Sequence, residues 1–337
     1  MTSIQPIRCE TLDSRRDDRS TEETTVWSLI LGAARLARNV GWTPELGGAL
    51  AIDPEGRALI LPAARCERAH LLWHPETGWY PAARDWDAHA LALFDLYLPL
   101  CHPPRFAVEL IAHLGQSIDG CIATRDGDAQ FVTGEANLRH LHRMRALCDA
   151  ILVGAETVAA DDPRLTTRLV PGANPTRIVL DPRRRLPPDR RLFRDGEAPT
   201  LVVCDRSCLD RHTPRLGQAE LIGIAATHAG LDLDALLAAL ADRGIRRVFI
   251  EGGGATVSRF LEAGRLSRLQ IAVAPLLIGT GRPGVRLPPP ARMADTLRPR
   301  ARIFRMGDDV LYDFDLTGSA PCPASAPSPG LELARIR

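Results

Sequence analysis

Lysine is absent from this sequence, so arginine supplies all 42 of its lysine-or-arginine positions. A site for phosphate or for a cationic catalyst must therefore use arginine, histidine or backbone amides. Arginine suits phosphate, because its planar guanidinium presents several donors at once. The 42 basic side chains are nearly balanced by 41 acidic ones, giving a net charge of +1. We therefore expect neither nucleic acid nor an anionic membrane as a partner.

Other absences exclude further classes of protein. No run approaches the roughly 20 apolar residues that span a bilayer, and the charged N-terminal 20 residues lack the apolar segment of a secretory signal. The eight cysteines show neither CxxC spacing nor a paired framework. Reduced thiols in a soluble, cytoplasmic protein fit this pattern best.

A length of 337 residues suggests two domains. We expect a disordered tail over residues 1–24, and the break Cys101-His102-Pro103-Pro104 ends a small α+β region, residues 25–101, of unknown role. All five tryptophans precede this break, and we interpret them as core rather than as base-stacking residues. Residues 317–337 are expected to form a flexible tail.

Between residues 105 and 316, apolar strands alternate with helices, which predicts an α/β fold with a mostly parallel sheet flanked by helices. The last two strands, near residues 303–305 and 310–314, are close in sequence, so we expect an antiparallel edge. The sheet matters for function because ligands of such folds bind beyond the carboxyl ends of the strands.

The segment RRVFIEGGGATVSRFLEAG, residues 246–264, is the most informative local pattern. An apolar strand runs into Glu251, three glycines follow, and a helix opens at Ala255. Glycines allow close backbone approach, and a helix N-terminus offers free N–H groups to an anion. The pattern suits a diphosphate, although a tight turn that binds nothing stays open, and it is not the GxGxxG of a dinucleotide-binding Rossmann domain.

Two more segments carry polar residues at predicted strand ends. DAILVGAETVAADDPRLTTR, residues 149–168, places Asp161 and Asp162 after a buried strand. No histidine or cysteine stands nearby at ligand spacing, so we reject a metal site there and expect none elsewhere. Residues 112–150 read as strand, loops around SIDG and FVTG, and then an arginine-bearing helix. Most of those arginines are typical of a solvated surface, with one or two available for phosphate.

In this order and spacing, the segments resemble the reductase domain of bacterial riboflavin-biosynthesis deaminase–reductases. The matching runs are SIDGCIA, FVTG, AILVG, DDPRLT, RIVLD, FIEGGGAT and VAPLLIG. DDPRLT with IEGGG about 85 residues later is a specific combination. The resemblance implies a dihydrofolate-reductase-like fold, a homodimer and NADPH as cofactor. It also implies the reaction, which is reduction of the ribosyl group of a 5-amino-6-ribosylaminouracil 5′-phosphate to ribityl.

The same resemblance implies which residues contact each ligand. Glu251 is the candidate catalytic residue, binding ribose hydroxyls. The implied contacts to the phosphorylated pyrimidine substrate are Arg145, Leu165, Arg168 and Glu251. The implied contacts to the cofactor are Gly115, Phe131, Thr157, Asp161, Gly253, Gly254, Ala255, Thr256, Val257, Ser258 and Arg259.

The sequence also departs from that family. Where the family commonly has Lys, Ser, Trp and Ser, this chain has His113, Ala129, Phe131 and Pro182. The family's other half is a zinc deaminase with H-x-E and P-C-x-x-C motifs. Here the only apparent match, His74-Pro75-Glu76, lies in a predicted turn and no P-C-x-x-C follows. We therefore expect neither zinc nor deaminase activity.

Two alternatives to this function stay open. The departures at His113 and Ala129 motivate the first, the same fold and cofactor acting on a different pyrimidine or on a pterin-like ring. The second is a non-catalytic ligand-binding or scaffold protein, with the tryptophan-rich region as its interaction part. The intact DDPRLT and EGGGAT segments count against the second.

Overall fold

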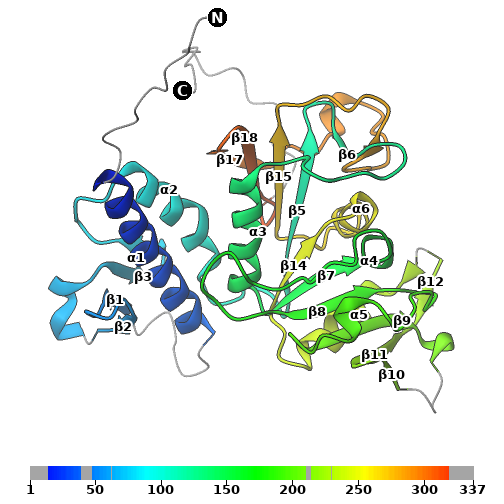
Figure 1. The fold of residues 1–337 in the computed structure, drawn as a ribbon, viewed down its shortest axis with the longest axis horizontal. Coiled ribbons are helices and arrows are strands. Elements are labelled where there is room, and N and C mark those ends of the chain that lie inside the picture. Colours follow the sequence, from blue (N-terminus) through cyan, green and yellow to red (C-terminus); the bar gives the residue numbers. More distant parts are fainter. Residues whose placement is uncertain (1–13, 39–47, 62, 210–213, 229, 319–337) are drawn as a thin grey trace, which may run out of the picture. The chain divides into compact units, whose positions relative to one another are not determined.

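The computed structural model describes residues 14–38, 48–61, 63–209, 214–228 and 230–318. The chain separates into two compact units, residues 1–103 and 104–337 (Figure 1). Within the described ranges, none of the helices is long and apolar enough to cross a membrane.

The first unit combines a four-stranded antiparallel sheet, in the order β2-β1-β3-β4, with two α-helices. Helix α1 packs against α2 and β1. Asp87 begins α2 by accepting a 2.6 Å hydrogen bond from the backbone N–H of Ala90. The elements are α1 (Ser14–Ala37), β1 (Gly48–Ile52), β2 (Ala58–Ile60), η2 (Ala63–Arg68), β3 (Leu71–His74), β4 (Gly78–Pro81), α2 (Ala88–Tyr97) and η3 (Leu98–Leu100).

Three of the five tryptophans predicted to be core residues are buried in this unit, and Trp86 is half-buried. Trp27 meets Tyr97 edge-on with ring centroids 5.7 Å apart, and Trp73 meets Trp79 at 5.5 Å. These three tryptophans are at most 9% exposed, whereas Trp42 lies outside the described residues. Turns join β1 to β2 and β3 to β4. The predicted tail of residues 1–24 is wrong from residue 14 onward, because α1 begins there; residues 1–13 lie outside the description.

The second unit is built on a ten-stranded sheet in the order β10-β11-β9-β8-β7-β14-β5-β15-β18-β17. The pairs from β11 to β15 are parallel, and the strands at both edges are antiparallel, so the predicted mostly parallel sheet and its antiparallel C-terminal edge are confirmed. The strands are β5 (Glu109–Ser117), β7 (Ala150–Gly154), β8 (Thr176–Leu180), β9 (Thr200–Asp205), β10 (Arg215–Leu216), β11 (Ala219–Ile224), β14 (Arg247–Glu251), β15 (Arg268–Ala274), β17 (Arg300–Met306) and β18 (Asp309–Asp315).

The two faces of this sheet have different coverings, because side chains alternate along each strand. Leu110, Ala112 and Leu114 of β5 point into a hydrophobic core with residues of α5 and α6. The alternate residues of β5, such as His113, face α3 instead. The helices are α3 (Glu135–Leu147), α4 (Ala155–Asp161), α5 (Leu233–Ala241) and α6 (Gly254–Glu262). The remaining short elements are β6 (Cys121–Ala123), η4 (Arg191–Phe193), η5 (Arg206–Cys208), β12 (Ala226–Thr227), β13 (Gly230–Leu231), β16 (Arg282–Pro283) and η6 (Met293–Asp295).

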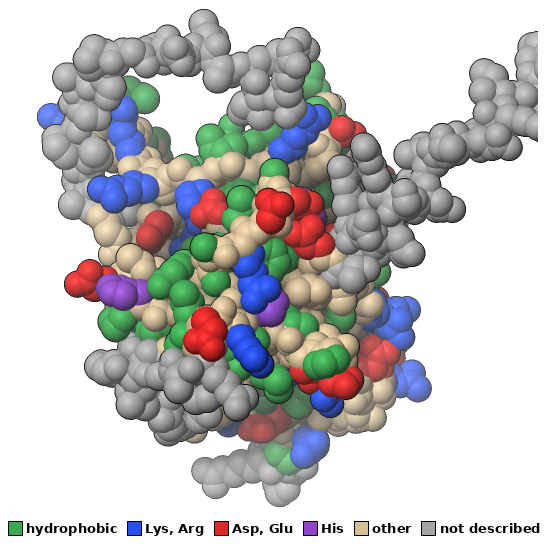
Figure 2. Space-filling model, turned by 90° about the vertical axis from the view of Figure 1, so that its left-hand side faces the viewer, with side chains coloured by type: hydrophobic (Ala, Val, Ile, Leu, Met, Phe, Trp, Pro, Cys, Tyr) green, Lys and Arg blue, Asp and Glu red, His purple; other side chains and the backbone are tan. Residues whose placement is uncertain are grey.

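Helix α4 is the main difference from the sequence analysis, which placed no helix between the strand of residues 150–154 and Asp161. The helix has only seven residues and begins directly after β7, so it shows no extended apolar periodicity. Residues 319–337, most of the predicted C-terminal tail, lie outside the described residues. On the face shown in Figure 2, hydrophobic, basic and acidic side chains are interspersed over the described residues, in keeping with the balanced charge.

Candidate functional site

Two segments distant in sequence meet at the carboxyl ends of the neighbouring strands β7 and β14. We call residues 252–254 the glycine loop. Gly252 and Gly253 have φ angles of +89° and +47°, which strongly favour glycine. A Cβ on Gly253 would lie 3.4 Å from Thr157 Oγ1 of α4 and 3.6 Å from Thr256 Oγ1 of α6. The glycine loop is therefore flanked by a hydroxyl from each of two helices.

The first turns of α4 and α6 lie side by side. Both helices begin after a glycine, Gly154 or Gly253, so neither has a side-chain cap for its first N–H groups. A Cβ on Gly154 would come within 2.7 Å of Thr256 Oγ1, which shows how closely the two helix starts approach. Free N–H groups and the positive ends of the helix dipoles favour an anion at such a position. The arrangement suits a diphosphate.

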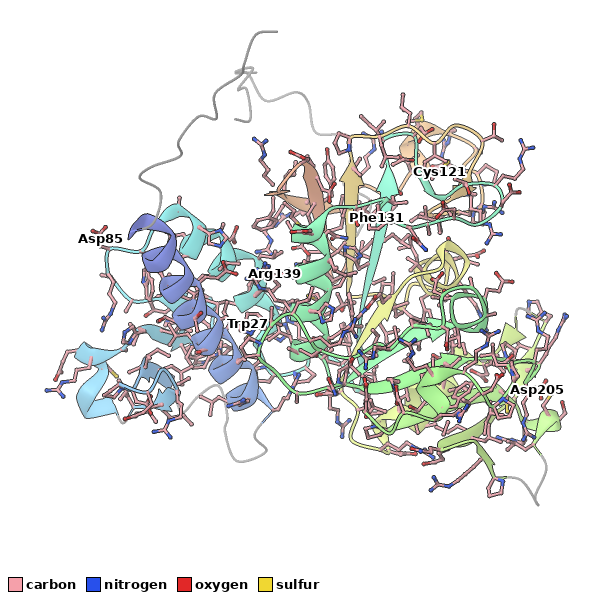
Figure 3. All side chains as sticks on the ribbon, viewed as in Figure 1. Trp27, Asp85, Cys121, Phe131, Arg139 and Asp205 are labelled. Atoms are coloured by element: carbon pink, nitrogen blue, oxygen red, sulfur yellow. The ribbon has the colours of Figure 1, made fainter. Side chains whose placement is uncertain are left out.

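Three other predicted cofactor residues lie on separate elements. Asp161 ends α4, and burial raises the pKa of its carboxyl. Gly115 of β5 lies under the start of α3, where a Cβ would be 2.8 Å from Thr133 Cγ2. Phe131 projects from the loop before α3 (Figure 3), is 91% exposed and has a φ of +60°. Strained backbone at a bulky residue is typical of functional sites.

The predicted cofactor residues 253–259, at the start of α6, divide into two groups. Gly253, Ala255 and Thr256 lie at the glycine loop and the exposed start of the helix. The other four residues have structural partners elsewhere. Gly254 packs on the Gly284 carbonyl, and Val257 lies in the hydrophobic core. The Ser258 hydroxyl accepts a hydrogen bond from Arg286 N, and the Arg259 guanidinium donates one to Leu231 O. The structure therefore brings only part of the predicted run 253–259 to the glycine loop through its side chains.

On the α3 face, Arg145 binds Glu251, the last residue of β14. Arg145 Nε and Nη2 donate to the two carboxylate oxygens of Glu251 at 2.8 and 2.5 Å, and Nη1 donates to the Thr166 carbonyl at 3.0 Å. The side chains are 6% and 16% exposed. This paired geometry fixes the orientation of Glu251 immediately before the glycine loop.

The DDPRLT segment and the two residues after it bring two more arginines to this face, and we call Arg145, Arg164 and Arg168 the arginine cluster. The segment turns at buried Leu165, whose φ is +55°. Arg168 Nη1 donates to Thr166 Oγ1 at 2.8 Å. Burial, with the charges of Arg145 and Arg164, lowers the pKa of Arg168. Such a concentration of positive charge favours an anion.

Two buried residues that the sequence did not single out support the arginine cluster. His142 Nδ1 accepts a 2.8 Å hydrogen bond from the backbone N–H of Arg168, so this nitrogen carries no proton. Burial, with Arg145 and Arg168, lowers the pKa of His142 to about 4. Thr166, 1% exposed, links Arg145 to Arg168. Only a tertiary structure reveals these contacts, because α3 and the DDPRLT segment pair through no local pattern.

A row of polar side chains crosses the α3 face of the sheet beside Glu251. The strand register makes neighbours of its five members in succession, which are Glu251, His113, Gln270, Asp313 and Arg302. His113 Nε2 lies 2.9 Å from Asn137 Oδ1, while Asn137 Nδ2 donates to Thr133 Oγ1. Burial lowers the pKa of His113 to about 4, so its ring is neutral near pH 7. The departure at residue 113 thus places a neutral side chain next to Glu251.

Within the described residues, no group of three or more His, Cys, Asp or Glu side chains is placed to hold a metal ion. The predicted substrate residues Arg145, Leu165, Arg168 and Glu251 are brought together at the α3 face. Glu251 also begins the turn into the glycine loop, so the two halves of the candidate site share this residue.

Comparisons with known proteins agree with these features. The family model of the RibD C-terminal domain matches residues 108–311. A 2,5-diamino-6-ribosylamino-4(3H)-pyrimidinone 5′-phosphate reductase of Methanothermobacter thermautotrophicus is 35% identical over 62% of this chain and 98% of its own length. The riboflavin biosynthesis protein RibD of Mycobacterium tuberculosis is 38% identical over 48% of this chain, and the match spans only 41% of that protein.

Solved structures show the same fold. RibD of Acinetobacter baumannii matches 67% of this chain and 62% of its own with a TM-score of 0.55 at 24% identity. The yeast riboflavin biosynthesis reductase Rib7 matches 66% and 96% with a TM-score of 0.53 at 20% identity. The mostly parallel α/β fold and the family resemblance predicted from the sequence are confirmed. From residue 108 to residue 311, this chain belongs to the RibD C-terminal domain family.

Proposed function

We propose that this chain is an NADPH-dependent reductase that converts the ribosyl group of a 5-amino-6-ribosylaminouracil 5′-phosphate-type pyrimidine to ribityl. The position of Glu251 carries the proposal. Arg145 holds its carboxylate, and the next residue opens the glycine loop. The end of β14 thus lies between the glycine loop, which suits a dinucleotide, and the arginine cluster, which suits a phosphorylated sugar. The name of the archaeal reductase supports the same substrate class.

The glycine loop fits a nicotinamide dinucleotide. A Cβ on Gly253 would meet nothing nearer than the two hydroxyls at 3.4 and 3.6 Å, so the loop is open toward Thr157 and Thr256. The N–H groups of α6 and these hydroxyls would hold the diphosphate. Arg183 and Arg185, both exposed just after β8, would bind the 2′-phosphate of NADPH. When bound, the cofactor supplies the hydride.

On the other side, Arg168 would bind the 5′-phosphate of the substrate. Leu165 is buried and would hold the segment that carries Arg168 in place. Both oxygens of Glu251 already accept from Arg145 and keep lone pairs for ribose hydroxyls. The residues would in this way hold the sugar carbon in place for hydride transfer. As the resemblance implies, we expect a cytoplasmic homodimer.

The proposal is tested by cofactor oxidation. We expect NADPH to be consumed with the ribosylaminouracil 5′-phosphate or with its 2-amino relative, and the faster of the two identifies the true pyrimidine. The dephosphorylated forms serve as matched controls and should react far more slowly. Absence of turnover with both phosphates, in protein that also ignores NADPH and NADH at millimolar levels, would refute the assignment.

A further inference from the structure

An acidic side chain lies against the arginine cluster. Glu197, in the loop between η4 and β9, accepts a 2.7 Å hydrogen bond from Arg164 Nη2. Its other carboxylate oxygen lies 3.5 Å from Thr166 Oγ1, the hydroxyl that also accepts from Arg168. Glu197 therefore places an anion at the outer edge of the cluster, where its side chain remains 31% exposed.

A hydrogen-bond network around the buried Arg177 holds Glu197 in this position. Arg177, 1% exposed, donates to both oxygens of Asp195 at 2.8 and 2.7 Å and to the Arg164 carbonyl at 3.2 Å. Asp195 Oδ1 in turn accepts from Glu197 N at 3.0 Å. Asn174 Nδ2 donates to the Glu197 carbonyl at 3.0 Å. The backbone on each side of the ion pair is thus fixed, and the pair is not a chance meeting of two mobile surface side chains.

The charges of the cluster are divided between two carboxylates. Arg145 donates to Glu251 through both Nε and Nη2 of its guanidinium. Glu197 is the direct counter-ion of Arg164. The negative charges of Glu197 and Glu251 also favour the charged form of Arg168. A substrate phosphate that binds Arg168 would come close to the Glu197 carboxylate, and two anions this near repel each other.

We propose that Glu197 is a specificity-determining residue that occupies the anion position beside Arg164 and Thr166 until a phosphate displaces it. This inference rests on the proposed function, which places the substrate phosphate at Arg168. On binding, the phosphate takes over the Arg164 guanidinium and the Thr166 hydroxyl, and the Glu197 side chain turns out to solvent. A weakly charged ligand cannot offset this displacement, so the site selects for a dianionic phosphate.

The test is Glu197→Gln, which removes the charge and keeps the size. We expect KM for the phosphorylated pyrimidine to fall about fivefold, and the inhibition constant of inorganic phosphate to fall similarly, because about 1 kcal/mol of competition is removed. The effect should fall on KM rather than on kcat. Glu220→Gln is the matched control, because Glu220 forms an equivalent 2.7 Å pair with Arg243 at the surface, and neither constant should change.

An unchanged or weaker affinity for inorganic phosphate in Glu197→Gln would overturn the inference. So would Arg164→Gln binding phosphate as well as wild type does. Phosphate binding, followed by thermal shift, requires no turnover. If the wild type fails to reduce the pyrimidine but Glu197→Gln binds phosphate more tightly, the proposed substrate fails and the role of Glu197 stands. Normal turnover with no gain in phosphate affinity gives the opposite result.

Discussion

The glycine loop and the arginine cluster flank the same residue, Glu251, but they are built differently. The loop presents backbone N–H groups and two hydroxyls, and its shape depends on positive φ angles at Gly252 and Gly253. The cluster presents guanidinium groups, each held by a carboxylate or by Thr166. One side is specified by backbone conformation and the other by side-chain partners.

This difference has a functional consequence. Backbone amides recognise a diphosphate through geometry and cannot distinguish its substituents. A set of guanidinium groups with fixed partners discriminates, because displacing each partner has a cost that only the right ligand offsets. On the proposed function, we expect general cofactor binding from the loop and substrate choice from the cluster. Variants that affect one side alone test this division.

The largest effect is expected for Gly253→Val. Valine at a φ of +47° is strained, and its branched side chain fills the space between Thr157 and Thr256. We expect NADPH affinity to fall by about 100-fold or more, equivalent to about 3 kcal/mol. Fluorescence titration of the dinucleotide measures the loss.

Gly264→Val is its control. Gly264 has a φ of +63° at the end of α6 and open space around its Cβ position, so this variant carries comparable backbone strain away from the loop. It should lose stability and keep its NADPH affinity. Equal loss of binding in both variants would mean that strain in α6, and not the loop surface, accounts for the effect.

A smaller loss, confined to the substrate, is expected for Arg168→Ala. Removing charge-assisted hydrogen bonds to a phosphate costs about 2 kcal/mol, or about a 30-fold rise in KM. NADPH affinity should stay at the wild-type value, because Arg168 belongs to the arginine cluster and not to the glycine loop. Steady-state kinetics measures KM for the substrate, and a separate titration measures the affinity for NADPH. An equal loss for both ligands would break the division between the two sides.

The backbone side of this site was largely predictable from the sequence, because a strand that runs into three glycines and a helix dictates its own local geometry. The same reasoning failed for α4, since a seven-residue helix gives too little periodicity to recognise. The parallel sheet followed from alternating apolar segments, but its register did not. The row of polar side chains beside Glu251 depends on that register and was not predicted.

The side-chain half was predicted as a set of residues, without the contacts between them. Arg145 and Arg168 were identified through the family resemblance, but their partners were not. The hydrogen bond that Arg168 N donates to His142 joins residues 26 positions apart, and the Arg164–Glu197 pair spans 33 positions. Such contacts depend on how α3 and the loops pack in space. The first unit lies outside the family match, which begins at residue 108.

A third variant tests whether side chains add selectivity to the backbone side. Arg183 and Arg185 are both exposed after β8, and the double change to alanine removes two charges from the proposed 2′-phosphate site. We expect NADPH affinity to fall about tenfold, while NADH affinity stays unchanged because NADH lacks that phosphate. Parallel titrations with the two dinucleotides measure the ratio. A similar loss for both would place these arginines outside the 2′-phosphate site.

The remaining effect is on stability and concerns the support of the arginine cluster, which contains a titratable residue. Burial and the neighbouring Arg145 and Arg168 lower the pKa of His142 to about 4, whereas in the unfolded chain it is about 6.5. The unfolded state therefore binds more protons as the pH falls, so stability is complete above about pH 6.5 and is lost toward pH 4. Glutamine retains an acceptor for Arg168 N but does not titrate. Urea unfolding of His142→Gln should thus show a loss between about pH 7 and pH 5 that is about 2 kcal/mol smaller than that of wild type. The full wild-type loss in this variant would mean that His142 titrates alike in the folded and unfolded states, and the hydrogen bond from Arg168 N to its Nδ1 would then have to be abandoned.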